Sequence, residues 1–321
     1  MSVGAPKIPV TVTEVVDVNP LIKRFRFQRR GEGPMPAFSG GAHIVVEMDD
    51  HGTRRMNPYS LMSAPTDLSG YEISVRRDDA GRGGSVYMHT HVTPGMQMVV
   101  SSPVNLFAID ARARKHLMIA GGIGITPFLS QIAALHAYGG RFELHYSARS
   151  PELAAYASDL KSQHGDKVHV YFDDQAQVID LQSLLKGQPL GTHLYVCGPK
   201  GMIAWVRATA QGLGWPEGAV HSEEFLAPPV GAPFQVALAA SGKTITVGPA
   251  QSLLEAIEAV GVEAPYLCRG GACGECETNV LQCDGTISHN DHWLTEEQRA
   301  SNTRIMPCVS RFTGKTLVLD R

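Results

Sequence analysis

The chain has 321 residues, 43% of them hydrophobic, which is enough for two or three domains with their own cores. Its 28 basic and 31 acidic side chains give a net charge of −3 and form no run of one sign, which argues against nucleic acid as a partner. The sequence shows neither a secretory leader nor an apolar run near the ~20 residues that cross a membrane, so a soluble protein of the reducing cytoplasm is expected.

The first third of the chain predicts short β-strands. The strand candidates are residues 10–18, 21–27, 44–48, 71–75 and 98–100. Turns that contain Gly, Pro or Asp separate them. Short strands at regular spacing favour an antiparallel β-barrel, which we assign to residues 1–109.

After about residue 110 the pattern changes to strands that alternate with helices. Predicted strands are 116–120, 142–147, 168–172 and 194–197, and predicted helices are 128–138, 151–160 and 199–210. Thr126 and Ser150 are expected to cap the first two helices. This alternation is typical of a parallel sheet with right-handed crossovers, so residues 110–226 are expected to form an α/β domain.

A Pro-rich, uncharged segment at residues 227–233 predicts a semi-rigid linker. Beyond it, residues 234–238 and 243–247 predict a β-hairpin. Two capping-box signatures then mark the starts of helices, Ser252 with Glu255 and Thr295 with Gln298. Residues 234–321 are therefore expected to form a third domain.

Four cysteines near the C-terminus carry the most specific signal in the sequence. Their pattern is C-x4-C-x2-C followed by a distant fourth cysteine, and the residues are Cys268, Cys273, Cys276 and Cys308. This is the plant-type ligand spacing for a [2Fe–2S] cluster. Glycines between the cysteines leave room for the cluster and turn backbone N–H groups toward sulfur. Such a centre passes electrons one at a time, so the spacing predicts an electron-transfer protein.

Four cysteines can also bind structural zinc or form disulfides. Structural zinc sites usually pair C-x2-C knuckles, which this spacing does not repeat. Disulfides would leave Cys197 and Cys283 to be placed and do not suit a reducing compartment.

Two Gly-rich segments lie where strands of the α/β domain are expected to end. One is Gly121-Gly122-Ile-Gly124-Ile-Thr126-Pro, and the other is Cys197-Gly198-Pro199. Ligands of open α/β sheets bind at the carboxyl ends of the strands, so the pair predicts a nucleotide crevice. Neither segment has the G-x-G-x-x-G fingerprint, and tight packing is the alternative explanation for the glycines.

Two barrel segments have the chemistry of a cofactor site. Arg82-Gly83-Gly84-Ser85 joins a cation to a Gly-Gly-Ser turn before a predicted helix, which suits a phosphate group. Asn57-Pro58-Tyr59-Ser60 follows a predicted strand. Each segment is weak evidence alone, because surface arginines and turn glycines are common.

In this order the motifs resemble those of the phthalate dioxygenase reductase family, within the ferredoxin reductase superfamily. The resemblance covers residues 10–321. It implies a flavin-binding β-barrel that takes FMN, a parallel-sheet domain that binds NADH, and a C-terminal β-grasp domain of the plant-type ferredoxin kind.

The resemblance also implies residue roles. Tyr59 would pack on the isoalloxazine, Ser60 would lie near flavin N5, and Phe225 would lie close to the flavin, although an ordinary core Phe is an equal reading. The implied catalytic set is Ser60, Cys197 and Phe225. The implied cofactor-binding residues are Asn57, Pro58, Tyr59, Ser60, Ser74, Val75, Arg76, Arg82, Gly83, Gly84 and Ser85 for FMN, and Gly121, Gly122, Gly124, Thr126, Arg149, Cys197, Gly198, Pro199 and Phe225 around NADH.

The sequence departs from the superfamily at Asn57, where an Arg that binds the flavin phosphate is usual. Arg54 and Arg55 lie two or three residues earlier, which is expected to alter the side of the strand that they face. The phosphate would then be met by Arg82, by the Gly-Gly-Ser amides or by a displaced Arg. Reductases of carnitine-type oxygenases are similar in carrying Asn here, which weakly disfavours phthalate as the substrate of the partner oxygenase.

The function implied by the resemblance is that of an NADH-dependent oxygenase reductase. Hydride passes from NADH to FMN, and single electrons pass through the cluster to a terminal Rieske-type oxygenase, which docks transiently on a monomeric reductase. Two alternatives stay open: an electron carrier or redox sensor with a vestigial flavin domain, and a reductase that acts directly on a small acceptor or O₂. Asp173 and Asp174 would repel a 2′-phosphate if they lie near the adenosine ribose, whereas Arg149 could contact a 2′-phosphate or the ribose and phosphates of NADH. The resemblance favours NADH. The substrate of the oxygenase is not encoded in this chain.

Thirteen histidines are scattered along the chain. His89 with His91, and His289 with Asp291 and His292, have spacings that metal sites also show. With so many histidines such pairs arise by chance, so we interpret them as surface or capping groups.

Overall fold

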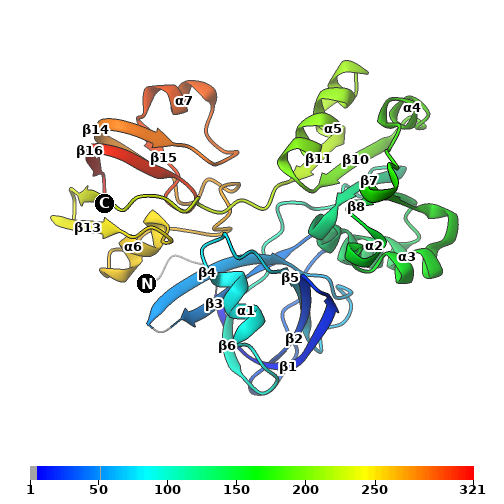
Figure 1. Cartoon of the computed structure of the whole chain (residues 1–321), viewed down its shortest axis with the longest axis horizontal. Coiled ribbons are helices and arrows are strands. Elements are labelled where there is room, and N and C mark those ends of the chain that lie inside the picture. The colour runs from blue at the N-terminus through cyan, green and yellow to red at the C-terminus, as the bar shows by residue number, and fades with distance from the viewer. Residues whose placement is uncertain (1–5, 51) are drawn as a thin grey trace.

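The computed structural model describes residues 6–50 and 52–321, which form three β-sheets with helices around them. Figure 1 shows the N-terminal sheet below, the parallel sheet to the right and the C-terminal sheet to the left. The expected fold class is confirmed: an antiparallel half-barrel, a parallel α/β sheet and a mixed C-terminal sheet. The boundaries 1–109, 110–226, 227–233 and 234–321 stay predictions.

The first sheet has the order β4-β3-β6-β1-β2-β5, and its neighbouring strands are antiparallel. The strands are β1 (Lys7–Asn19), β2 (Ile22–Arg29), β3 (His43–Asp50), β4 (Thr53–Ser60), β5 (Tyr71–Arg76) and β6 (Gln97–Ser101). The five predicted strands are present, but β4 was missed because it carries Arg, Asn and Pro. Pro58 fits there because β4 lies at the edge of the sheet, where a strand tolerates a missing N–H. Helix α1 (Gly84–Thr90) follows β5.

The second sheet is parallel, with the order β11-β10-β7-β8-β9. Its strands are β7 (Lys115–Gly121), β8 (Phe142–Ala148), β9 (Val168–Phe172), β10 (Thr192–Cys197) and β11 (Val220–Glu223), and its helices are α2 (Thr126–Tyr138), α3 (Ala157–His164), α4 (Leu181–Lys186) and α5 (Lys200–Gly212). Helices α2 and α3 pack on one face, and α4 and α5 pack on the other. The four predicted strands are confirmed, whereas α4 and β11 were not predicted.

Both capping predictions for this domain were wrong. A 3₁₀ turn, Gly122–Ile125, precedes α2, so the Thr126 hydroxyl donates to the carbonyl of Ile123 at 2.9 Å instead of capping. The predicted helix 151–160 is broken. A 3₁₀ turn begins after Ser150, which makes no side-chain cap, and α3 starts only after Tyr156, whose φ is +64°.

The third sheet has the order β13-β12-β16-β14-β15 and is mixed, because β12 and β16 are parallel. It contains β12 (Phe234–Leu238), β13 (Lys243–Val247), β14 (Thr278–Ser288), β15 (Arg304–Ile305) and β16 (Arg311–Leu319), with helices α6 (Leu253–Ala259) and α7 (Glu296–Ser301). The predicted hairpin β12–β13 and both capping boxes are confirmed. Among the described residues no helix combines the length and apolarity needed to cross a membrane.

We call each sheet with its helices and loops a module. A buried ion pair joins the loop before α1, in the first module, to helix α6 in the third. Arg82 donates to both carboxylate oxygens of Glu255, at 2.7 and 3.2 Å, and both side chains are less than a tenth exposed. The same carboxylate accepts the backbone N–H of Met56 on β4 and that of Ser252, its own capping partner. The helix cap of α6 is thus also a contact between modules, and an apolar cluster that includes Val45, Met56 and Leu254 surrounds it.

We predict that neither partner tolerates loss of the other. Glu255→Gln keeps the helix cap, since Gln also serves at this position, but leaves Arg82 as an unpaired buried cation. Removing one side of a buried pair costs about 3–5 kcal/mol, so Glu255→Gln and Arg82→Met should each lower the midpoint of thermal unfolding by several degrees. The double variant should lower the midpoint of thermal unfolding by less than the sum of the two single decreases. Arg77→Met, which breaks an exposed pair with Asp79, is the matched control. Additive losses would contradict a coupled pair.

Candidate functional site

A cavity of about 520 Å³ lies where the three sheets meet. Predicted flavin residues that line it are Asn57, Pro58, Tyr59, Ser60, Ser74, Arg76 and Arg82, and Thr126 and Phe225 line it from the second module. The cysteine loop contributes Cys268, Arg269, Gly270 and Ala272 to the same wall. The three sequence motifs therefore converge on one space. In the described part of the chain, Val75, Gly83, Gly84 and Ser85 lie outside this lining.

Four buried polar atoms of residues that line the cavity have no hydrogen-bond partner within the described chain. They are His43 Nε2, Ser60 Oγ, Glu223 Oε2 and Arg269 Nε. A buried polar group without a partner is costly, so four of them around one cavity mark a place that a polar ligand would complete. Ser60 was predicted. His43 and Glu223 were missed, because neither belongs to a motif that spacing alone reveals.

Burial shifts the pKa values of both missed residues, His43 and Glu223. Burial lowers the pKa of His43 to about 4, so its imidazole is neutral at physiological pH. Burial also raises the pKa of the Glu223 carboxyl to about 8, so this group is largely protonated near neutrality. The cavity thus offers two uncharged side chains that both donate and accept hydrogen bonds.

Tyr59 is fixed within the wall by its neighbours. Its ring packs against the core of the first sheet, and its hydroxyl accepts a hydrogen bond from Asn57 Nδ2 at 3.3 Å. Burial raises the pKa of the Tyr59 phenol to about 12, so the ring stays neutral. A fixed neutral aromatic ring in a cavity wall suits a planar ligand such as isoalloxazine.

The Gly83–Gly84 turn lies against side chains of β4. A Cβ on Gly84 would stand 2.3 Å from Asn57 Nδ2, and one on Gly83, whose φ is +94°, would stand 3.3 Å from Arg55 Nη2. The turn thus brings backbone close to one amide and one guanidinium. The hydroxyl of Ser85 instead lies 3.0 Å from the Asp78 backbone N–H, from which it accepts.

The sequence predicts that Arg54 and Arg55 face a different side of the strand from residue 57, and for Arg55 this prediction is wrong. Side chains alternate along a strand, so Arg55 shares a side of β4 with Asn57, while Arg54 faces the other way and pairs with Glu47. Arg55 is also held by Asp50 at 3.3 Å and by the carbonyl of Ala250. A displaced cation therefore stands at the turn.

A second cavity, of about 620 Å³, lies at the carboxyl ends of the parallel strands. The predicted residues that line it are Gly121, Gly122, Gly124, Arg149, Gly198, Pro199 and Phe225. Asp173 lines it too, whereas Thr126 faces the first cavity only. The two cavities share Arg76, Ile123, Glu224 and Phe225, so a ligand in one is separated from a ligand in the other by a few side chains.

The glycines that line the second cavity have different structural roles. A Cβ on Gly124 would stand 2.3 Å from the carbonyl oxygen of Cys197, and one on Gly121 would stand 2.7 Å from Pro199 Cδ. Tight packing between the ends of β7 and β10 therefore explains these two. Gly122, with φ of +55° and open space beside it, is the position that leaves room for a ligand. The Cys197 thiol is 1% exposed, and burial raises its pKa.

The cysteine loop is arranged for a metal cluster. Cys268, Cys276 and Cys308 are buried, Cys273 is half-buried, and all are free thiols. The sulfurs of Cys276 and Cys308 lie 3.3 Å apart, and the N–H of Gly270 donates to the sulfur of Cys268. Hydrogen bonds, from Cys273 first and then from backbone N–H groups, lower the pKa of Cys268, which favours the thiolate that binds iron.

Two glycines and one arginine shape this loop. Gly271 and Gly274 have positive φ, and a Cβ on them would meet Val309 at 2.8 Å and Trp293 at 2.3 Å. The guanidinium of Arg269 stacks 3.7 Å from the Tyr266 ring and pairs with Glu258. Three thiols from this Gly-rich loop and a fourth from Cys308, between β15 and β16, fit the [2Fe–2S] group that the spacing predicts.

Comparisons with known proteins agree with this geometry. Residues 236–313 match the 2Fe-2S iron-sulfur cluster binding domain family, and residues 98–220 match the N-terminal domain of dimethylamine monooxygenase subunit DmmA-like proteins. The structure of a phthalate dioxygenase reductase, described as modular for electron transfer from pyridine nucleotides to [2Fe-2S], superposes with a TM-score of 0.88 at 33% identity, over 98% of each chain.

Curated relatives extend over the whole chain. A carnitine monooxygenase reductase subunit of Acinetobacter baumannii is 44% identical over 314 residues, which cover 97% of each protein. The beta subunit of a heme-dependent oxidative N-demethylase of Ectopseudomonas mendocina is 42% identical over 98% of each protein. The chain therefore belongs to the phthalate dioxygenase reductase-like family, the electron-transferring reductase subunits of oxygenase systems that carry a 2Fe-2S domain.

Proposed function

We propose that the chain is an NADH-dependent reductase that holds FMN in the first cavity and passes electrons through its cluster to a Rieske-type oxygenase. One observation carries this proposal: Tyr59, Phe225 and Cys268 border the same cavity, which adjoins the nucleotide cavity. FMN would supply the step from a two-electron donor to one-electron carriers. A vestigial flavin domain is disfavoured, because the cavity and its four polar atoms without partners persist.

The phosphate end of the first cavity supports FMN as the flavin. Glu255 and the carbonyl of Ala250, both from the third module, hold Arg82 and Arg55 beside the Gly83 turn. With the phosphate at this turn, the third module would stand where the larger FAD extends beyond its first phosphate. Asn57, Arg55 and the backbone of the turn would hold the phosphate, because Arg55 has a single contact to Asp50 at 3.3 Å, whereas Arg82 is held by both carboxylate oxygens of Glu255.

The nucleotide cavity supports NADH. Arg149 and Asp173 both line it at the ends of β8 and β9. A carboxylate there favours the free ribose hydroxyls of NADH and repels the additional phosphate of NADPH. Gly122 gives the pyrophosphate open space, and Phe225, about half exposed between the cavities, would screen the flavin until the nicotinamide arrives.

Two kinds of oxygenase are candidates for the partner. The relative named for carnitine monooxygenase supports our first choice, a Rieske-type enzyme that acts on a quaternary amine. The relative named for a heme-dependent N-demethylase supports a haem enzyme as the second candidate. Transient docking, a monomeric state and a cytoplasmic location stay predictions.

The first test is reduction and reconstitution of the holoprotein. Anaerobic NADH should bleach the visible bands of flavin and cluster, and released flavin should be FMN by chromatography. Electrons should then support turnover by a purified Rieske-type or haem oxygenase with product matched to NADH consumed. Faster turnover with O₂ or a small acceptor alone would favour a direct reductase. Unbleached bands would contradict the proposed function.

We predict that Glu223 sets a pH limit on flavin reduction. Its pKa of about 8 keeps it neutral at lower pH, and its ionisation at higher pH places a negative charge in the wall of the cavity that would hold the flavin. Reduction by NADH should therefore slow about tenfold between about pH 7 and pH 9, as the protonated fraction falls. Glu223→Gln should abolish this slope in stopped-flow measurements. Exposed Glu217→Gln is the control, and an unchanged slope in Glu223→Gln would refute the assignment.

We further predict that Arg55 takes the part of the missing arginine at position 57. Loss of a charge-assisted hydrogen bond costs about 1.5–3 kcal/mol, so Arg55→Met should weaken FMN binding by about 10- to 100-fold. Arg54→Met, on the opposite side of β4, should change it less than about twofold. Fluorescence titration of flavin-free protein with FMN measures both. Equal effects of the two substitutions would exclude the assignment.

A further inference from the structure

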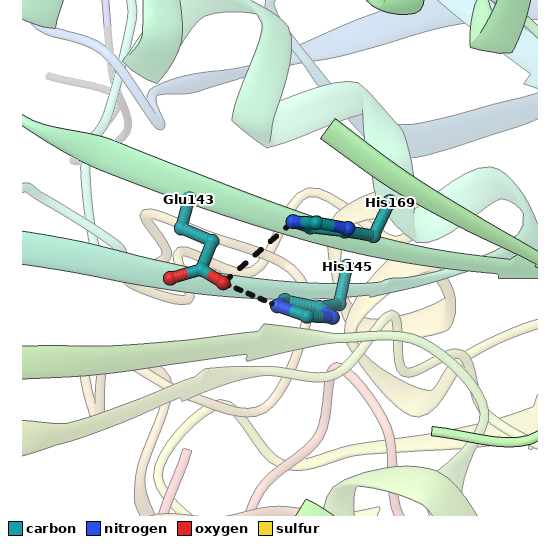
Figure 2. A group of neighbouring side chains, drawn as sticks. All are labelled: Glu143, His145 and His169. Atoms are coloured by element: carbon teal, nitrogen blue, oxygen red, sulfur yellow. Dashed lines mark hydrogen bonds and ion pairs between the residues drawn. The ribbon is translucent and has the colours of Figure 1, made fainter. Parts of the chain in front are cut away.

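A group of three possible metal ligands lies away from both cavities, on strands β8 and β9. Glu143 and His145 are two residues apart on β8, so their side chains point to the same face of the sheet. His169 on β9 is the direct partner of His145 in the parallel ladder. Figure 2 shows the two imidazole rings stacked, each with one nitrogen toward the carboxylate of Glu143.

The ligand atoms of this group converge on a small space. His145 Nε2 lies 3.0 Å and His169 Nε2 lies 3.7 Å from the same oxygen, Glu143 Oε1. One ligand atom from each of the three residues lies within 4.8 Å of the others. The imidazoles stack with centroids 4.7 Å apart.

Neighbouring residues orient two of the three ligands. The Tyr171 hydroxyl lies 2.9 Å from His145 Nδ1, which leaves Nε2 to face Glu143. Lys115 pairs with the other carboxylate oxygen, Glu143 Oε2, at 2.5 Å. Partners of this kind fix the ring and the carboxylate of a metal site in place.

We propose that Glu143, His145 and His169 form a binding site for a divalent transition-metal ion such as Zn²⁺ or Ni²⁺. Two imidazole nitrogens and one carboxylate oxygen suit these ions better than Mg²⁺ or Ca²⁺, which prefer oxygen alone. Water would fill the remaining positions, since the side chain of His169 is 41% exposed and opens the group to solvent.

Binding requires a modest closure of the group. Ligands at about 2.0–2.1 Å from a tetrahedral ion stand about 3.3 Å apart, and the two distances to Glu143 bracket this value. The stacked rings do not yet aim at one point, so His169 must turn about its side-chain bonds. It is free to do so because it is the exposed member, whereas buried His145 stays fixed by Tyr171.

The ion would join an edge strand to its neighbour. β9 is the last strand of its sheet, and it is followed by Asp173, while β8 is followed by Arg149. A metal link between His145 and His169 would hold β9 against β8 beneath the nucleotide cavity. The amide hydrogens of β9 should then exchange more slowly when metal is present.

The test is equilibrium dialysis of the holoprotein against ZnCl₂ or NiCl₂ with elemental analysis. A Cys283→Ser background removes a competing thiol, and iron and sulfide assays show that the cluster stays intact. One additional equivalent should bind, and His169→Ala or Glu143→Gln should each weaken binding at least about tenfold. His164→Ala is the matched control, because His164 stacks on His136 in another histidine pair.

Hydrogen exchange gives an independent readout. Metal should slow exchange in β9 of the parent protein and of His164→Ala, but not of His169→Ala. His169→Gln serves if the alanine variant is unstable. Equal affinity in the parent and His169→Ala, or slower exchange in β9 of both, would overturn the proposal.

Discussion

The Arg82–Glu255 pair is the interaction on which the arrangement of the modules depends. A carboxylate that caps its own helix would normally face solvent, but here it is buried against another module and needs a cation there. Arg82 supplies that charge, and Met56 adds a backbone hydrogen bond. The geometry of this pair is directional, so it fixes the orientation of α6 over β4, which apolar packing alone would leave freer.

Because α6 is fixed over β4, the cysteine loop borders the flavin cavity. Cys268 and Gly270 line the same wall as Tyr59 and Ser60, although more than 200 residues separate them in the chain. Electron transfer between two cofactors depends on their distance and on a fixed medium between them. An enzyme built this way needs no large motion of its iron–sulfur module for internal transfer, which leaves the exposed side of the loop for an external partner.

The parts of the site that the sequence predicted are the local ones. The cysteine spacing, the capping boxes and the Gly-rich strand ends are short segments whose residues act together, so their chemistry is visible in a single stretch of chain. His43 and Glu223 could not be found this way. Each is an ordinary residue on a strand, and it matters only because folding buries it at a cavity wall without a partner. The metal group on β8 and β9 was also missed, because His169 meets His145 only through strand pairing.

Position 57 carries Asn where the motif usually has Arg, and the alternation of side chains along β4 lets another arginine take its place. An arginine moved by one residue would point to the other face of β4, as Arg54 does toward Glu47. An arginine two residues away lies on the same face as position 57. Arg55 is such a residue, and its guanidinium lies beside the Gly83 turn. The amide of Asn57 then occupies the place nearest Gly84, where a guanidinium would be crowded by Arg82, 3.4 Å from its oxygen. Charge and space are thus redistributed over two positions of one strand face, and the motif can lose its arginine while the turn keeps a cation beside it.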